Sequence, residues 1–151
     1  MGDEVNDNET LPYLFEEKSQ GKYRSYNFGF HGYGTNEMLR ILETGLLDKI
    51  VIDKKPSIAI YQATIGHIDR ASGNFLYSTY RPKYKLDSSG QLQYVGAFRS
   101  KLVSRVILQL NRSYLLKATL PRLLGWKRTP YDVNLFLQMV KRSNEIFTQK
   151  H

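Results

Sequence analysis

Aromatic side chains alternate with small or polar ones over residues 23–31. Tyr26, Phe28 and Phe30 occupy every second position of this segment. A period of two residues is typical of a strand with one buried face, so the segment predicts a first strand. Glycines at positions 32 and 34 follow it and end the predicted strand.

Helical spacing follows these glycines. Thr35 is a suitable N-cap for a helix that we predict over residues 36–44 and that ends at Gly45. Met38, Ile41 and Leu42 within it, and Leu46 just beyond its end, fall at helical spacing. The spacing therefore predicts an amphipathic helix directly after the first strand.

A second helix is predicted over residues 57–68. Pro56 suits the first turn of such a helix, and Ile58, Tyr61, Gln62, Ile65 and Ile68 follow it. Ile58, Ala59 and Ile60 are also compatible with the start of a buried strand. Both interpretations remain open at this point.

Turn-forming residues separate two aromatic segments in the middle of the chain. The segments are residues 75–80 and 92–98, and Asp87-Ser88-Ser89-Gly90 lies between them. Asp, Ser and Gly favour tight turns, so this region predicts a β-hairpin. Residues 102–110 are apolar on both faces and are the best candidate for a central strand. A further strand is predicted over residues 114–120.

The last part of the chain has the clearest helix signal. Thr129 is a favourable N-cap, Pro130 suits the first turn, and Asp132 stands three residues after the cap. The face predicted to be apolar consists of Val133, Phe136, Leu137 and Val140. The order of elements predicts a single compact α+β domain, with a small antiparallel or mixed sheet and about three helices. A length of 151 residues is consistent with one domain.

Charge divides the chain near residue 20. Residues 1–20 carry six acids against Lys18, a net charge of −5, whereas residues 21–151 hold 21 bases against 8 acids, a net charge of +13. We interpret residues 1–20 as a flexible acidic arm and residues 21–151 as the basic α+β domain. The arm contains one apolar motif, which either recruits a partner or anchors the arm as a strand or turn. The motif consists of Leu11, Pro12, Tyr13, Leu14 and Phe15.

Several classes of chemistry lack their usual residues. Cysteine is absent, which excludes disulfides, thiolate zinc sites and cysteine nucleophiles. His31, His67 and His151 are too scattered for a metal motif, and the common nucleotide, esterase and zinc-protease motifs do not occur. We therefore expect no cofactor, no metal and no catalytic residue.

The start of the chain and its hydropathy bear on where the protein works. Residues 1–10 are polar and acidic, unlike a signal peptide. No apolar run approaches the roughly 20 residues that span a bilayer. We expect an intracellular protein of the cytoplasm or nucleus, peripheral to a membrane where it contacts one.

Basic residues dominate the second half of the chain. Residues 81–142 contain thirteen Lys and Arg against only Asp87 and Asp132. Such an excess attracts phosphates or anionic lipid, although a merely solvated basic surface is the alternative. Trp126 lies where an indole can enter a membrane interface, stack on a base or anchor the core. The predicted polyanion-binding residues are Lys101, Arg105, Arg112, Lys117, Arg122, Lys127 and Arg128.

One short motif favours an enzyme. His31-Gly32, followed by Asn36, Ile41-Leu42 and Gly45-Leu46, resembles the strand-to-helix entry of ADP-ribosyltransferases. In that family the His-Gly pair binds a nicotinamide dinucleotide, a Tyr or Ser-Thr-Ser segment stacks on the nicotinamide, and a late acid orients the ribose. Tyr77 would take the stacking role, but Glu145 is no convincing late acid. The alternative is a buried histidine that ends a strand before a glycine turn.

The order of parts is similar to that of rhabdovirus matrix proteins. Those proteins have a flexible arm, an aromatic strand, a helix, a turn with Lys and Pro, a second helix, strands and a terminal helix. The turn here is Lys54-Lys55-Pro56. The arm departs from the family because it is acidic and lacks a Pro-Pro-x-Tyr motif. The resemblance implies a virion protein that binds nucleocapsid or RNA, contacts an anionic membrane surface and self-associates.

We therefore expect a structural assembly protein of the matrix type. Basic charge that is spread along the chain, without a cofactor, suits a protein that contacts both a ribonucleoprotein and an anionic membrane. The alternatives are an ADP-ribosyltransferase-like enzyme that uses His31 and an RNA-binding subunit of a larger ribonucleoprotein particle.

Overall fold

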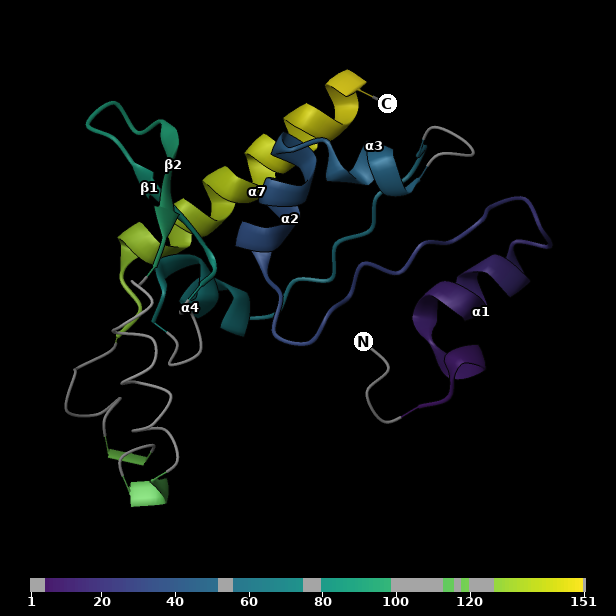
Figure 1. Cartoon of the computed structure of the whole chain (residues 1–151), viewed down its shortest axis with the longest axis horizontal. Helices are drawn as coiled ribbons and strands as arrows, with labels where there is room; N and C mark the ends of the chain where they lie inside the picture. Colours follow the sequence, from purple (N-terminus) through teal and green to yellow (C-terminus); the bar gives the residue numbers. More distant parts are fainter. Residues whose placement is uncertain are drawn as a thin grey trace. The chain divides into compact units, whose positions relative to one another are not determined.

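The fold was obtained as a computed structural model, which describes residues 5–51, 56–74, 80–98, 113–115, 118–119 and 127–150 (Figure 1). The chain divides into two compact units, residues 1–33 and residues 34–151. The described elements are five α-helices, one short 3-10 helix and one two-stranded antiparallel sheet. The predicted α+β class is confirmed.

The first unit contains two helical elements, where the sequence predicted only an arm. Helix η1 spans Asp7–Glu9 and helix α1 spans Leu11–Lys18, so the apolar motif is helical. The Glu9 carboxylate accepts a hydrogen bond of 2.8 Å from the backbone N–H of Asn6, which caps η1. The strand or turn that we considered for the motif is wrong. The flexibility of the arm stays a prediction.

The strand predicted over residues 23–31 is wrong. Residues 23–30 belong to no helix or strand, and Tyr26 and Phe30 are 36% and 57% exposed. The backbone N–H of Phe30 bonds the carbonyl of Phe28, and that of Tyr33 bonds the carbonyl of Phe30, so the segment ends in tight turns. The alternating pattern identified strand-forming residues, but a strand also needs a second strand to pair with.

The second unit is built around its terminal helix. Helix α7 spans Pro130–Lys150 and packs against α2, Thr35–Glu43, and α4, Gly66–Ser72. Helix α3, Leu46–Ile50, follows α2. The hairpin lies near the N-terminal end of α7 (Figure 1). These helices and the hairpin enclose a core of Leu39, Ala71, Tyr84, Leu135, Met139 and Ile146.

Helix α2 agrees with the predicted helix, but its cap differs. Gly34, and not Thr35, is the N-cap, and the Glu37 carboxylate accepts a hydrogen bond of 2.9 Å from the Gly34 N–H. The capping group is therefore the side chain three residues into the helix. The helix ends at Glu43 with Thr44 as its C-cap, one residue before the predicted end.

Helix α4 begins later than predicted. Residues 56–64 belong to no helix or strand, and Gly66 is the first helical residue. The predicted helix over residues 57–68 is therefore wrong for most of its length. Ile58 and Ile60 are exposed, so the apolar spacing here does not mark a buried helix face.

The hairpin and its turn are confirmed, although the first strand lies further along the chain. Strand β1 spans Pro82–Leu86, strand β2 spans Leu92–Ala97, and Tyr84 pairs with Tyr94 across them. The Asp87 carboxylate accepts hydrogen bonds from the backbone N–H groups of Ser89 and Gln91, at 2.8 and 2.9 Å. The segment 75–79 lies outside the described residues.

Two predicted strands follow the hairpin. The candidate central strand, residues 102–110, lies outside the described residues. Within residues 114–120, the described positions 114–115 and 118–119 are helical, so the predicted strand is wrong there. Thr119 donates a hydrogen bond of 2.8 Å to the Leu115 carbonyl, four residues earlier, as in a helix.

The cap of α7 is confirmed, but its predicted buried face is only partly right, since Phe136 alone of its residues packs against the core cluster. The Asp132 carboxylate accepts hydrogen bonds of 2.7 and 2.9 Å from the N–H and hydroxyl of Thr129. Val133 and Leu137 are exposed, and the core face instead holds Leu135, Met139 and Ile146. The core face is therefore turned away from the predicted one, because α2, α4 and the hairpin all contact this side of the helix.

Candidate polyanion-binding surface

The start of α2 fixes the position of the hairpin. Asn36 is 1% exposed, and its side-chain amide donates to the carbonyls of Pro82, at 2.9 Å, and Ala71, at 3.4 Å. Glu37 is also buried and forms an ion pair of 3.3 Å with Arg81, directly before β1. These contacts tie helix α2 to both α4 and the hairpin.

An aromatic and basic layer joins α2 to the outer strand. The Arg40 guanidinium lies 4.0 Å from the centre of the Tyr94 ring, a cation–π contact. Tyr84 donates a hydrogen bond of 2.6 Å from its hydroxyl to Glu43, which also pairs with Arg40. Burial and the neighbouring Glu43 raise the pKa of Tyr84 well above its ordinary value. The hydroxyl of Tyr84 therefore stays protonated and holds the hairpin against α2.

Arginines and lysines of the second unit differ in their partners. Arg40, Arg81, Arg128 and Arg142 each form an ion pair with a carboxylate. Lys150 does so more loosely, at 3.7 Å from Asp48. The lysines without an ion pair to another described residue are Lys49, Lys83, Lys85, Lys127 and Lys141. Arg81 and Arg128 link separate segments, Arg40 and Arg142 pair within their own helices, and the five lysines supply charge that no described carboxylate neutralises.

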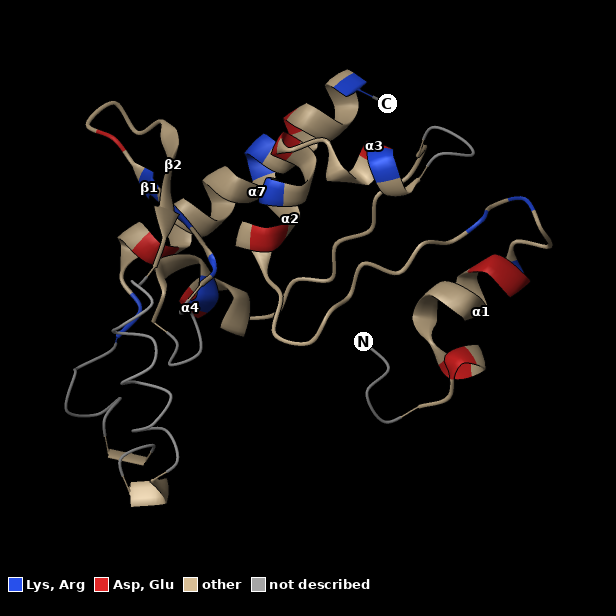
Figure 2. Cartoon of the chain, in the orientation of Figure 1, with Lys and Arg blue, Asp and Glu red and all other residues tan. Residues whose placement is uncertain are grey.

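Two of these lysines lie on the hairpin. Tyr84 faces the core, so the side chains of Lys83 and Lys85 stand on the other side of β1. Lys85 is directly opposite Gln93 on β2, and the Lys83 ammonium lies 5.6 Å from the Phe98 ring centre. Strand β2 has no charged residue, so the lysines give the hairpin its positive sign (Figure 2).

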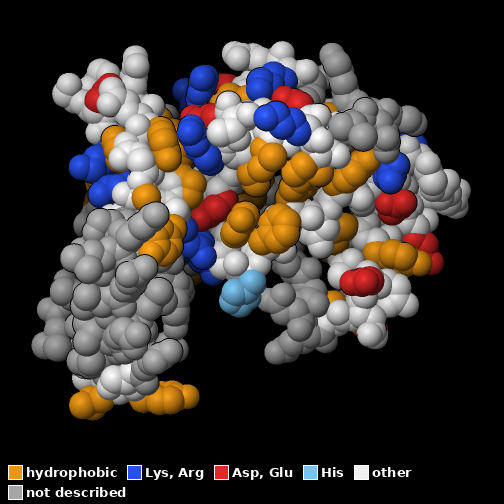
Figure 3. All heavy atoms as spheres, viewed as in Figure 1, with side chains coloured by type: hydrophobic (Ala, Val, Ile, Leu, Met, Phe, Trp, Pro, Cys, Tyr) orange, Lys and Arg blue, Asp and Glu red, His pale blue; other side chains and the backbone are white. Residues whose placement is uncertain are grey.

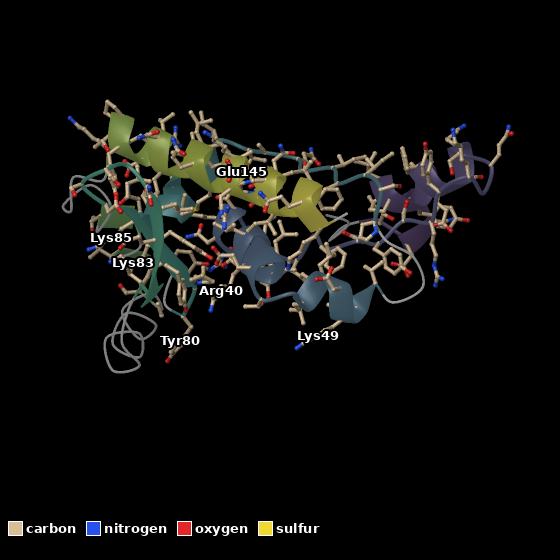
Figure 4. The ribbon with its side chains drawn as sticks, turned by 90° about the horizontal axis from the view of Figure 1, so that it is seen from above. Arg40, Lys49, Tyr80, Lys83, Lys85 and Glu145 are labelled. Atoms are coloured by element: carbon tan, nitrogen blue, oxygen red, sulfur yellow. The ribbon has the colours of Figure 1, made fainter. Side chains whose placement is uncertain are left out.

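The hairpin lysines belong to a wider basic and aromatic surface. In Figure 4, Arg40, Lys49 and Tyr80 point away from α7, on the side of the molecule where Lys83 also lies. Tyr80 and Tyr94 are 56% and 45% exposed. Figure 3 shows basic side chains beside a group of hydrophobic ones in the region of α2 and the hairpin. We call Arg40, Lys49, Tyr80, Lys83, Lys85 and Tyr94 the basic surface. It covers both faces of the hairpin, because Tyr94 lies opposite Tyr84 and the two lysines stand on the other face.

The structure describes two of the residues predicted to bind a polyanion. Lys127 is exposed, whereas Arg128 binds Asp69 through two hydrogen bonds, of 2.7 and 2.8 Å. Arg128 therefore joins the start of α7 to α4. The remaining predicted residues, Lys101, Arg105, Arg112, Lys117, Arg122 and Trp126, lie outside the described residues.

The lysines of the hairpin were missed by the sequence analysis. The signal was present in the Lys83-Tyr84-Lys85 tripeptide, because alternation in a strand places its two lysines on one face and its tyrosine on the other. The predicted first strand begins at residue 75, seven residues before β1 begins at Pro82, so the Lys-Tyr-Lys alternation falls outside the predicted strand.

The structure does not provide the strand that the transferase resemblance requires. The described chain before His31 is irregular, and His31 itself is exposed in a turn of the first unit. A buried histidine at the end of a strand is therefore also wrong. Glu145 is on α7 of the second unit, and Tyr77 lies outside the described residues.

Two further features concern metals and membranes. Within the described residues, no three His, Asp or Glu side chains are grouped so that they could hold a metal ion. None of the described helices is long and apolar enough to cross a membrane. In comparisons with known proteins, no family model, no curated protein and no solved structure matches this chain.

Proposed function

We propose that the protein binds a nucleic acid through the basic surface. The observation that carries the proposal is the division between paired arginines and unpaired lysines. Lys49, Lys83 and Lys85 have no carboxylate partner among the described residues, so their charge is available to phosphates.

The tyrosines of the surface favour a nucleic acid over a lipid bilayer. Tyr80 and Tyr94 are about half exposed, and Arg40 stacks on the Tyr94 ring. Aromatic rings beside cations suit a single strand, because bases stack on the rings while the cations contact the phosphates. An anionic membrane requires the positive charge but not the exposed rings.

The matrix-like assembly role is the wider form of this proposal. It adds an anionic membrane surface and self-association to the binding of RNA or nucleocapsid. An RNA-binding subunit of a larger particle would use the same basic surface without the membrane. Binding to RNA and to anionic vesicles, measured separately, distinguishes these two forms.

The test compares the wild type with the double variant Lys83→Gln/Lys85→Gln. Binding to a fluorescent single-stranded RNA is measured by anisotropy between about 50 and 200 mM salt. Each phosphate contact contributes about 0.7 to the slope of log affinity against log salt, so the double variant should lose about 1.4 of that slope. Lys141→Gln is the matched control, since Lys141 is an exposed lysine on α7 without an ion pair to a described residue.

Three outcomes would count against the proposal. The first is that the wild type shows no affinity for RNA, or an affinity that does not change with salt. The second is that the double variant binds RNA with the same slope of log affinity against log salt as the wild type, which would remove the hairpin lysines from the site. The third is that the protein binds anionic vesicles but not RNA, which would make a membrane, and not a nucleic acid, the partner of the basic surface.

A further inference from the structure

We propose that residues 57–65 form an edge at which two copies of this chain associate as antiparallel strands about a twofold axis. This 57–65 edge lies between α3 and α4 along the chain and shares no residue with the basic surface. The proposal concerns self-association and does not depend on nucleic-acid binding.

Most of the backbone of this edge makes no hydrogen bond within the described part of the chain. Residues 57–63 belong to no helix or strand, and their backbone groups make no hydrogen bond to another residue in the part of the chain that the structure describes. Their sequence, Ser-Ile-Ala-Ile-Tyr-Gln-Ala, contains residue types that favour strands. Unpaired backbone in such a segment is a template for pairing with another chain.

The side chains of the edge face two ways. Ile58 and Ile60 are 52% and 69% exposed. Tyr61, between them and α4, is half-buried, and its hydroxyl lies 2.7 Å from Nδ1 of His67. Burial raises the pKa of Tyr61 to about 12, so its hydroxyl stays neutral. Tyr61 therefore holds the edge to the protein while the isoleucines remain exposed.

The charge distribution identifies a second copy as the occupant. Residues 56–68 contain no Lys, Arg, Asp or Glu and are the longest such run in the chain. Burial and the nearby Arg70 lower the pKa of His67, so its ring also stays neutral. Because residues 21–151 carry a net charge of +13, two copies repel each other over most of their surface. At the 57–65 edge two copies can approach without opposing like charges.

A twofold pairing centred on Ile60 gives a specific geometry. Each Ile60 lies opposite the same residue of the other copy, and each Ile58 lies opposite Gln62. Directly opposed residues of antiparallel strands have Cα atoms about 4.5 to 5.5 Å apart. A contact of this kind is self-complementary, so it closes at a dimer and does not extend into a fibre.

The first experiment introduces charges at the axis. Sedimentation velocity is measured from about 5 to 200 µM protein, in about 0.5 M salt and without RNA, for the wild type, Ile60→Lys, Ile60→Glu and an equal mixture of the two variants. We expect a wild-type dimer, at least about tenfold weaker association of each variant alone, and a restored dimer in the mixture. Leu137→Lys, at a 55% exposed position of α7, is the matched control and should dimerise like the wild type.

The second experiment uses the absence of cysteine from the chain. Ile60→Cys should form a disulfide-linked dimer under mild oxidation, because the opposed Cα atoms lie within the roughly 4.4 to 6.8 Å that a disulfide spans. Leu137→Cys should remain monomeric on a non-reducing gel.

The proposal is overturned if the wild type stays monomeric over the whole concentration range. It is also overturned if Ile60→Lys associates as the wild type does, or if the mixture of oppositely charged variants fails to associate. The Lys83→Gln/Lys85→Gln variant separates the two proposals, since it should keep the dimer whether or not it has lost RNA binding.

Discussion

The hairpin and the 57–65 edge are both rich in residues that favour strands, and they differ in what each has to pair with. Strands β1 and β2 pair with each other, and Tyr84 of the hairpin is 2% exposed in the core. Residues 57–63 make no backbone hydrogen bond to another described residue, and Ile60 is 69% exposed. Strand-forming sequence therefore gives a strand only where a turn supplies a partner and a core covers one face.

The two regions also differ in charge. Lys83 and Lys85 stand on the outer side of the hairpin, where lysines disfavour pairing with a further strand. The 57–65 edge has no such residue. This difference suits the hairpin to phosphates and the edge to a second copy of the protein.

The largest expected effect is on stability, and it contrasts one residue from each region. Tyr84→Ala removes a buried ring and its hydrogen bond to Glu43, so the free energy of unfolding should fall by about 3 to 5 kcal/mol. Ile60→Ala should change it by less than about 0.5 kcal/mol in the monomer, because Ile60 is exposed. Urea unfolding at low protein concentration measures both. Equal effects of the two substitutions would contradict the comparison.

A smaller effect is expected where the hairpin meets α4. Gly73 has φ of 78°, and a Cβ atom there would clash with the ring of Phe98, just beyond β2. Gly73→Ala should therefore lower the free energy of unfolding by about 3 kcal/mol, since backbone strain adds to the steric clash.

Gly90 in the hairpin turn is the control for this clash. It has φ of 79°, and a Cβ atom there would meet nothing within 4 Å. Gly90→Ala should lower the free energy of unfolding by only about 1 to 2 kcal/mol, from strain alone. If both glycine variants lose the same stability, the packing of Phe98 against α4 is not as described.

The smallest effect concerns Asp132, which caps the start of α7 and follows Tyr131, whose hydroxyl accepts a hydrogen bond from the Leu86 N–H of the hairpin. Burial tends to raise the pKa of Asp132, but hydrogen bonds from Ser72 and Thr129 outweigh it and hold the pKa below its ordinary value. Asp132→Ala should lower the free energy of unfolding by about 1 kcal/mol at neutral pH.

This effect should depend on pH with a defined sign. Because the pKa of Asp132 is lower in the folded protein, its contribution is present above the unfolded pKa of about 3.9 and is lost as the pH falls through the folded value. Wild type and Asp132→Ala should therefore converge in stability in acid. A constant difference from pH 7 to about pH 3 would show that the Asp132 carboxylate does not cap the helix.

Sequence alone predicted the local signals well. The Thr129 and Asp132 cap, the helix that follows Gly34 and the Asp87 to Gly90 turn all appear where the pattern indicated. Each depends on residues within a few positions of one another, whose hydrogen bonds form without distant contacts. Of the basic surface, sequence indicated only that the second half of the chain is positive.

The side of an element that becomes buried was set by packing. The face of α7 predicted from Val133 and Leu137 is exposed, because α2, α4 and the hairpin meet the face that carries Leu135 and Met139. The partners of Arg81 and Arg128 were equally hidden in the sequence, since Glu37 and Asp69 lie 44 and 59 positions away from them.

The sequence by itself therefore determined the cap of α7, the hairpin turn, the charge and the overall class, because these depend on short spacing and composition. Only the tertiary structure decided that Arg81 and Arg128 would bind distant carboxylates while Lys83 and Lys85 formed no ion pair with a described residue, and that residues 57–63 would have no strand partner among the described residues. The physical reason is that pairing and burial are contacts between segments far apart in the chain, whose distances no local pattern specifies.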